Sequence, residues 1–249
     1  MKIKSQNEAT EIKTIVNFAK NFPKSSETYP LYHIDSPYRV KRYVDKVKEI
    51  KRYLSHGKIL DWGSGYGQML FLLHNRGFDV IGCELTEHYK HGTLADVIGQ
   101  KIVYLSDPVK LPFENSSFHG MLSCGVLEHV ANPEESLKEI KRVLKKGGYF
   151  FIYHLPNKFS WIEFMSHRIL NKGHERLYKR DKTVEWLKAY NFKVLRVYYE
   201  SFMPLNMGFV GDGLRRLVDN PLYSLLNDLI PRVPVLKYFS QNITIICQR

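Results

Sequence analysis

The chain has 249 residues, of which 44% are hydrophobic and 25% charged, a composition typical of a folded domain and not of a disordered or fibrous chain. Three widely spaced cysteines argue against a disulfide framework and a cysteine-rich zinc site. With no apolar leader and no apolar run of about 20 residues, we expect a cytoplasmic protein. The net charge of +12 gathers in the flanks: residues 1–56 carry +6, residues 57–154 carry −1 and residues 155–249 carry +7.

Two helices and a loop are predicted before residue 56. Residues 8–20 have the spacing of a short amphipathic helix, and two prolines favour a loop over residues 21–32. Ser36 followed by Pro37 is typical of a helix start, with serine as the N-cap and proline in the first turn. Apolar residues then recur on one helical face to about residue 55, where this helix should end.

From residue 58 the pattern alternates between strands and helices. Strands are predicted at residues 58–61, 79–84, 101–105, 120–124, 149–154, 193–199 and 243–247. Helices are predicted at residues 67–75, 88–98, 133–144 and 182–190, the third being closed by Gly147 and Gly148. Such alternation places the chain in the α/β class, with a mostly parallel sheet covered on both faces. Residues 201–241 interrupt the alternation, so an inserted cap is expected before the last strand.

A glycine-rich loop follows the first predicted strand, in the segment Ile59–Gln68 (ILDWGSGYGQ). On its own, such a loop is also found as a plain tight turn between a strand and a helix. Glu84 favours the binding interpretation, because it ends the next strand 21 residues after Gly63. A carboxylate at that place accepts hydrogen bonds from both hydroxyls of a ribose.

Asp61 distinguishes between two classes of ligand for this loop. Its carboxylate lies two residues before the first glycine, where it would repel the pyrophosphate of a dinucleotide. A ligand with an amino acid moiety presents an ammonium group instead, which a carboxylate attracts. The glycines also follow the spacing Asp61-x-Gly63-x-Gly65-x-Gly67, whereas the dinucleotide pattern would need a glycine at Gln68.

These features resemble motif I of class I S-adenosylmethionine-dependent methyltransferases, in the type-11 branch that includes ubiquinone-type O-methyltransferases. Ser106–Phe118 is similar to the family's adenine loop, and Ser123–Val130 (SCGVLEHV) to the motif after its fourth strand. The resemblance covers roughly residues 56–155, and more loosely residues 180–200. It implies S-adenosylmethionine as the cofactor and a Rossmann-like, mostly parallel seven-stranded sheet with helices on both faces, N-terminal helices and an inserted cap before the last strand.

The same resemblance implies the residues that bind the cofactor. Asp107 would take the adenine amino group, and the backbone at Pro108 would line the adenine ring. Tyr66 is expected to face the cofactor or its sulfonium, a cation that the face of an aromatic ring attracts. The expected set is Asp61, Gly63, Ser64, Gly65, Tyr66, Gly67, Glu84, Leu85, Asp107, Pro108, Cys124 and Gly125.

Two histidines are candidates for a catalytic base that would remove a proton from a hydroxyl acceptor. His129 and His154 each follow the end of a predicted strand on the ligand side. The alternative for His129 is a helix-start residue bonded to backbone, and for His154 a packed residue beside Pro156. No metal site is expected, because Gly125 takes the place of the first carboxylate in the Glu-x-x-Glu-His motif through which some relatives bind a divalent ion.

Four segments follow from these observations. Residues 1–55 are expected to form a helical lid with aromatic side chains at Tyr29, Tyr32, His33 and Tyr38, and residues 56–200 the cofactor-binding core. Residues 201–241 form the cap and residues 242–249 return to the core as its last strand. The cap carries Leu214, Leu217, Leu222, Leu225, Leu226, Leu229 and Ile230 with Arg215, Arg216 and Arg232 alongside, a pattern that suits either packing over the sheet or contact with an anionic membrane.

Three functions remain open from the sequence. The first is methyl transfer to a small-molecule or lipid-linked acceptor, with oxygen as the expected atom. The second is methylation of RNA held by the basic flanks, although no RNA-binding module is evident and nucleic acid is the less favoured partner. The third is binding of S-adenosylmethionine without turnover. The acceptor, the methylated atom and the oligomeric state are not predicted.

Overall fold

A computed structural model describes residues 7–23, 31–85, 92–169, 173–205 and 216–249. Its first half contains α1 (Glu8–Asn21), α2 (Pro37–Tyr53), β1 (Lys58–Trp62), α3 (Gln68–Asn75), β2 (Asp79–Glu84), α4 (Leu94–Val97), β3 (Ile102–Tyr104) and β4 (Phe118–Cys124). Its second half contains α5 (Pro133–Val143), β5 (Leu144–Pro156), α6 (Trp161–Ile169), α7 (Arg180–Ala189), β6 (Lys193–Glu200), α9 (Pro221–Leu229) and β7 (Asn242–Gln248). Short 3₁₀ turns lie at Arg216–Asp219 (η1), Ile230–Arg232 (η2) and Leu236–Phe239 (η3).

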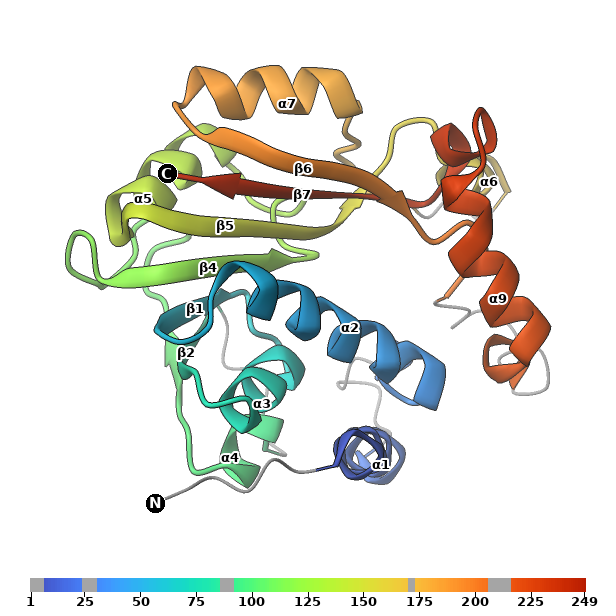
Figure 1. Ribbon diagram of the computed structural model, residues 1–249, viewed down its shortest axis with the longest axis horizontal. Helices are drawn as coiled ribbons and strands as arrows, with labels where there is room; N and C mark the ends of the chain where they lie inside the picture. Colours follow the sequence, from blue (N-terminus) through green and yellow to red (C-terminus); the bar gives the residue numbers. More distant parts are fainter. Residues whose placement is uncertain (1–6, 24–30, 86–91, 170–172, 206–215) are drawn as a thin grey trace.

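The seven strands form one sheet in the order β3-β2-β1-β4-β5-β7-β6 (Figure 1). The first five strands pair in parallel, and β7 pairs antiparallel with both β5 and β6. The predicted fold class, a Rossmann-like and mostly parallel seven-stranded sheet, is therefore confirmed. The carboxyl ends of β1, β2 and β4 meet at one edge, where such sheets bind their ligands.

Alternate residues of the central strands feed two separate hydrophobic layers, as the period of a strand requires. Ile59 and Phe151 face the layer formed with α1, α2 and α3. Leu60 and Phe150 face the opposite layer, which includes residues of α5 and α7. Figure 1 shows these helices on the two sides of the sheet, so the prediction of helices on both faces is also confirmed.

Two predicted helices were wrong in their boundaries, and one helix was not predicted. The helix predicted at 88–98 begins only at Leu94 in the described part of the chain, because Thr93 is extended and forms a capping box with Asp96. Gly147 and Gly148 do not close a helix: α5 ends at Val143 and both glycines lie within β5. Helix α6 was not predicted from the sequence.

Helix α2 is tied to strand β6 by buried ion pairs. Arg42 and Lys46 both contact the carboxylate of Glu200, at 2.9 and 2.7 Å. Burial alone would raise the pKa of Glu200, but the two cations and His154 outweigh it and hold the pKa well below its ordinary value. Helix α2, near the start of the sequence, is thus anchored to β6, which lies about 150 residues later.

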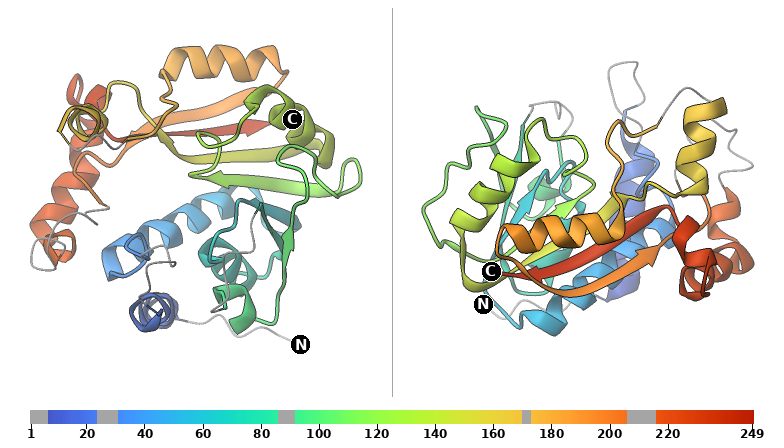
Figure 2. Two further views of the ribbon diagram at one scale, coloured as in Figure 1. Left: turned by 180° about the vertical axis from the view of Figure 1, so that it is seen from behind. Right: turned by 90° about the horizontal axis from the view of Figure 1, so that it is seen from above.

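The segment 216–241 lies beyond the carboxyl ends of β5 and β6 and against the start of α2 (Figures 1 and 2). The Tyr38 hydroxyl donates to Asp228 (2.7 Å), and the Arg42 guanidinium contacts the same carboxylate (3.3 Å). The amide of Asn157, just past β5, donates to the backbone carbonyls of Tyr238 and Ser240. Of the predicted cap residues, Leu214 and Arg215 lie outside the described residues, as does Tyr29 of the predicted lid.

Candidate functional site

The glycine loop turns sharply after β1 because two successive amides bond back to the neighbouring strand. The N–H groups of Gly63 and Ser64 both donate to the carbonyl of Cys83, at 2.9 and 3.0 Å. Gly63, Gly65 and Gly67 have φ values of +68°, +53° and +81°, which favour glycine. A Cβ at Gly63 would lie 2.4 Å from Val126, whereas one at Gly65 would meet open space. The loop thus packs tightly at its start and is open at its middle.

Glu84 stands beside the open part of this loop, at the end of β2. Its carboxylate accepts the N–H of Gly65 at 3.0 Å and the N–H of Leu85 at 2.8 Å. These bonds fix the side chain at the loop and use one lone pair on each oxygen, leaving others to accept ribose hydroxyls. The position agrees with the predicted role of Glu84, which stays a prediction, as does that of Leu85.

Two buried oxygens at the ends of β1 and β4 have no hydrogen-bond partner among the described residues: Asp61 Oδ2 and Ser123 Oγ. Asp61 is 1% exposed. Burial, and next the negative charge of Glu84, raise its pKa from 3.8 to about 7. The carboxyl has a backbone hydrogen bond with Leu70, but a buried oxygen left without a partner is costly unless a ligand supplies one. The ammonium group of S-adenosylmethionine would supply it, so the residues present fit that cofactor.

Cofactor affinity is expected to rise with pH up to about 7. Asp61 must lose its proton to pair with an ammonium group, so below its raised pKa the affinity should fall roughly tenfold per pH unit. Without ligand the folded protein holds this proton between pH 3.8 and about 7 while the unfolded chain releases it. Stability should therefore fall as the pH rises through that window.

Calorimetry in two buffers of different ionisation enthalpy measures the proton released on binding. Asp61→Asn keeps the size of the side chain and removes the titration, so it should abolish both pH effects. Equal affinity of the wild type at pH 5.5 and pH 7 would contradict the pairing, because the deprotonated fraction of Asp61 should change roughly fifteenfold between them.

The residues predicted to contact the adenine ring are more exposed to solvent than Asp61. Asp107 is exposed, and one carboxylate oxygen accepts the N–H groups of Val109 and Lys110, both at 2.8 Å. These two bonds lower the pKa of Asp107 and shape the turn that carries Pro108. Neither residue touches the glycine loop by any interaction recorded within the described ranges, so their contact with adenine stays a prediction.

The ring of Tyr66 is buried rather than presented at the surface. It packs edge-on against Phe22 with ring centroids 5.0 Å apart, and lies 6.5 Å from Phe18 of α1. The remaining loop residues, Ser64 and Gly67, lie between strand and helix, with the Gly67 N–H donating to the Ser64 carbonyl at 2.8 Å. The packing gives Tyr66 a core role; its contact with the cofactor stays a prediction.

Cys124 and Gly125 lie at the carboxyl end of β4, and His154 lies beside them in β5. The Cys124 thiol lies 3.8 Å from Nδ1 of His154, and Gly125 has a φ of +72°. His154 has a φ of +59° at a register shift between β5 and β7, and its ring packs edge-on against Tyr43 at 5.6 Å. Burial lowers the pKa of His154 to about 3, so the imidazole is neutral near pH 7. Its Nε2 is buried with no recorded partner in the described ranges.

His129 belongs to a separate group, which sequence reasoning saw only in part. Ligand-type atoms of Glu128, His129 and His174 lie within 4.8 Å of one another. Burial raises the pKa of Glu128 to about 7, and a hydrogen bond from His174 Nδ1 to Glu163 (2.9 Å) raises the pKa of His174. His174 is 45 residues from His129 in the sequence, so no spacing rule could have joined them. The predicted bases His129 and His154 thus stand in different surroundings.

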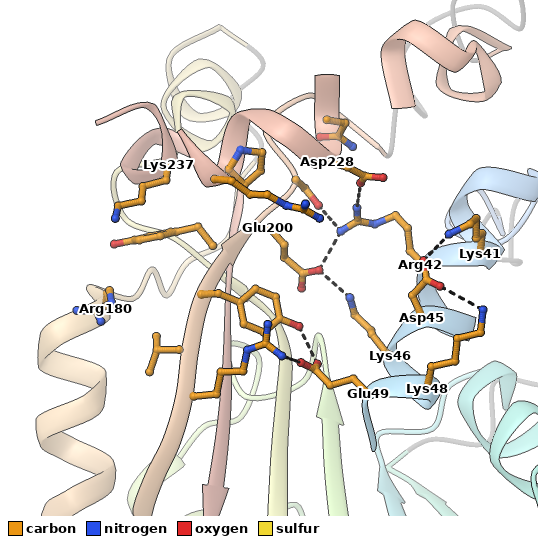
Figure 3. A pocket seen from close by; sticks show the side chains of 18 of the residues that line it. Lys41, Arg42, Asp45, Lys46, Lys48, Glu49, Arg180, Glu200, Asp228 and Lys237 are labelled. Carbon is orange, nitrogen blue, oxygen red and sulfur yellow. Dashed lines mark hydrogen bonds and ion pairs between the residues drawn. The ribbon is translucent and has the colours of Figure 1, made fainter. Parts of the chain in front are cut away.

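A wide basic groove of 910 Å³ lies between α2, β6 and the segment 216–241 (Figure 3). Nine cationic side chains line it: Lys41, Arg42, Lys46, Lys48, Arg52, Arg180, Arg196, Arg232 and Lys237. Four carboxylates face them, those of Asp45, Glu49, Glu200 and Asp228, which leaves a surplus of five positive charges. In Figure 3 Arg42 and Lys46 of α2 point across the groove toward Glu200 of β6.

Comparisons with known proteins agree with this geometry. Residues 60–152 match the type-11 family model described as "Methyltransferase domain". The chain is 25% identical to a probable tRNA methyltransferase 9B of Mus musculus over 199 residues, 74% of this chain and 40% of the mouse protein. It is 27% identical to a sterol 24-C-methyltransferase of Gibberella zeae over 165 residues, 58% of this chain and 43% of that protein. The chain thus spans less than half the length of these two relatives.

The fold has close counterparts among solved structures. A putative methyltransferase from Bacillus halodurans superposes with a TM-score of 0.56 at 18% identity, covering 82% of this chain and 97% of that one. The matched residues 60–152 contain the glycine loop, Glu84 and the His129 segment. Residues 60–152 are therefore a class I S-adenosylmethionine-dependent methyltransferase domain of the type-11 branch, and S-adenosylmethionine is the cofactor expected at the Asp61–Gly67 loop.

Proposed function

We propose that this protein transfers a methyl group from S-adenosylmethionine to an oxygen of a small-molecule or lipid-linked acceptor. The observation that carries the proposal is the buried Asp61 Oδ2, which has no hydrogen-bond partner among the described residues and precedes the open glycine loop. The sulfonium supplies the activated methyl group, and the protein supplies alignment and proton removal. The sterol methyltransferase among the relatives supports a lipid acceptor as a class.

The group formed by Glu128, His129 and His174 is the proposed acceptor side of this site. It follows the carboxyl end of β4, next to Gly125. Partial desolvation of the ring and the charge of His174 lower the pKa of His129, which keeps its imidazole neutral and able to accept a proton near pH 7. His154 is the second candidate base, with its buried Nε2 facing away from bulk water.

Replacing His129 by glutamine is expected to slow methyl transfer by about 10²–10⁴-fold, the usual contribution of a general base. The His129 side chain is 65% exposed, so the fold should tolerate the change. Cofactor affinity, measured by calorimetry, should stay at the wild-type value. A variant with full turnover would remove His129 from the mechanism and leave His154 as the candidate.

Labelled-methyl transfer tests the function itself. The full chain is incubated with methyl-labelled S-adenosylmethionine and separated lipid, RNA, protein and small-molecule fractions of a cell extract. We expect label in the lipid or small-molecule fraction, bound through an alkali-stable ether or an ester oxygen. Label confined to protein, or cofactor bound without any transfer, would contradict the proposal.

RNA methylation is the second candidate, favoured by the basic groove. Its cations come from α2, α7, β6, η2 and η3, and the same groove is lined by the aromatic side chains of Tyr38, Tyr198, Tyr199 and Tyr238. Cationic grooves with aromatic side chains suit single-stranded nucleic acid. The tRNA methyltransferase among the relatives agrees with this candidate. Label in the RNA fraction would decide for it.

Chelation is expected to leave turnover unchanged. Gly125 supplies no carboxylate at the place where the metal-binding motif has one, although His174 brings a third group to Glu128 and His129. Activity measured with and without a chelator checks this. Loss of activity that a divalent ion restores in the wild type, and does not restore in His174→Ala, would contradict the prediction.

A further inference from the structure

Helix α9 shows its apolar stripe to solvent and buries a polar residue. Leu222, Leu225, Leu226 and Leu229 fall at the i, i+3, i+4, i+7 spacing of one helical face and are between 37% and 62% exposed. Asn227 on the other face is fully buried, and its side-chain oxygen accepts the N–H groups of Phe202 and Met203 at 2.7 and 2.8 Å. In a helix that packs on a protein core this arrangement is reversed.

Helix α6 has the same inside-out pattern. Trp161, Met165 and Ile169 recur at every fourth residue, and Phe164 lies beside them, each at least 36% exposed. Glu163 is 3% exposed and pairs with His174 behind the helix. Two neighbouring helices that both expose apolar faces indicate a site for an apolar partner, because contiguous apolar surface is costly in water.

Both helices lie at one end of the molecule. Figures 1 and 2 place α6 together with α9 and the turns η2 and η3, beyond the carboxyl ends of β5 and β6. The Trp161 indole N–H donates to the carbonyl of Phe202 at 2.7 Å, which ties α6 to the segment leading into α9. Of 19 exposed large apolar side chains in the described residues, 15 belong to residues 159–169 and 217–239. The apolar surface is therefore concentrated and not scattered.

Cations stand beside the aromatic rings of this end face. Arg168 lies 5.9 Å from the Phe164 ring, Lys179 5.8 Å from the Phe159 ring and Lys237 5.3 Å from the Tyr238 ring. Apolar side chains interleaved with Lys and Arg are the composition of helices that lie in a bilayer interface and pair with anionic headgroups. A second copy of the chain would bring the same cations against each other.

We infer that this end face, formed by α6, α9, η2 and η3, docks on the surface of an anionic lipid bilayer. The apolar side chains enter the acyl region and the neighbouring cations contact the headgroup phosphates. No helix in the described parts of the chain is long and apolar enough to cross a membrane, so the contact is with one leaflet. The inference rests on the proposed function in one respect: docking would bring the proposed site close to a lipid-linked acceptor.

The test is co-sedimentation of the full chain with vesicles. We expect binding to vesicles of phosphatidylcholine mixed with phosphatidylglycerol, and much weaker binding to phosphatidylcholine alone. Leu225→Glu and Phe164→Glu should each weaken binding roughly tenfold or more, since a charge must then enter the acyl region. Val97→Glu is the matched control: Val97 is 58% exposed on α4, outside this face, and its variant should bind like the wild type.

Three results would overturn the inference: a folded wild type that sediments with neither vesicle, a control variant that loses binding as strongly as Leu225→Glu, or a wild-type dimer in light scattering that Leu225→Glu converts to a monomer. Cofactor binding is measured on the same proteins. Vesicle binding without cofactor binding would contradict the proposed function and leave the docking face standing.

Discussion

Gly63→Ala should destabilise the protein by about 2–4 kcal/mol and remove measurable cofactor binding. The residue has a φ of +68°, and an added Cβ would lie 2.4 Å from Val126 Cγ2 and 3.2 Å from Val126 Cβ. Rotation of the Val126 side chain does not relieve the contact fully, because its rotamers are restricted and its Cβ would itself stay 3.2 Å from the added atom. Thermal unfolding and calorimetry with S-adenosylmethionine measure the two effects.

Gly65→Ala is the matched control for this change. Its φ of +53° imposes a similar backbone penalty, but its Cβ would meet nothing within 4 Å. We expect a loss of only about 1 kcal/mol from the backbone strain. Adding Val126→Ala to Gly63→Ala should recover part of the lost stability. Equal effects of the two glycine substitutions would show that the contact with Val126 is not the cause.

Glu84→Ala should weaken S-adenosylmethionine binding by about 1–3 kcal/mol, roughly 5- to 150-fold. The substitution removes the carboxylate that is held toward the loop by the N–H groups of Gly65 and Leu85. It would also leave the Gly65 N–H without its acceptor, so part of the loss reflects a less ordered loop. Calorimetry at constant pH measures the change.

Two variants separate these contributions. Glu84→Gln keeps one oxygen to accept the Gly65 N–H and loses the charge, so its affinity should fall between those of the wild type and Glu84→Ala. Asp107→Ala removes an exposed carboxylate on the adenine side and should cost less than Glu84→Ala. Unchanged affinity in Glu84→Ala would show that the ribose is held elsewhere.

The sheet and the loop could be predicted because their signals are local. Lys58–Trp62 and Asp79–Glu84 are short buried runs, and the glycines between β1 and α3 meet a steric demand visible in the sequence itself. The same locality explains the errors. Thr93 and Asp96 form a capping box that competes with the helical pattern around them, and the glycines of β5 were read as a helix end.

The acceptor side could not be predicted because it depends on contacts distant in sequence. His174 lies near Glu128 and His129 and also bonds to Glu163 on α6, a helix that was not predicted from the sequence. The leucines of α9 have the spacing of a core-facing stripe, and only the buried Asn227 shows that the helix is turned the other way. The spacing of apolar residues predicts that a helix has an apolar face, but it does not predict whether that face packs on the core or points to solvent.

The position of β7 has a consequence for synthesis. Although β7 follows β6 in the sequence, it lies between β5 and β6 in the sheet and, among the described strands, is the sole neighbour of β6. During translation β6 must therefore wait as an unpaired strand until residues 242–248 leave the ribosome, and Glu200 at its end cannot be fixed beside Arg42 and Lys46 before then. A nascent chain halted before residue 242 would expose both an open strand edge and an apolar layer, which favour aggregation.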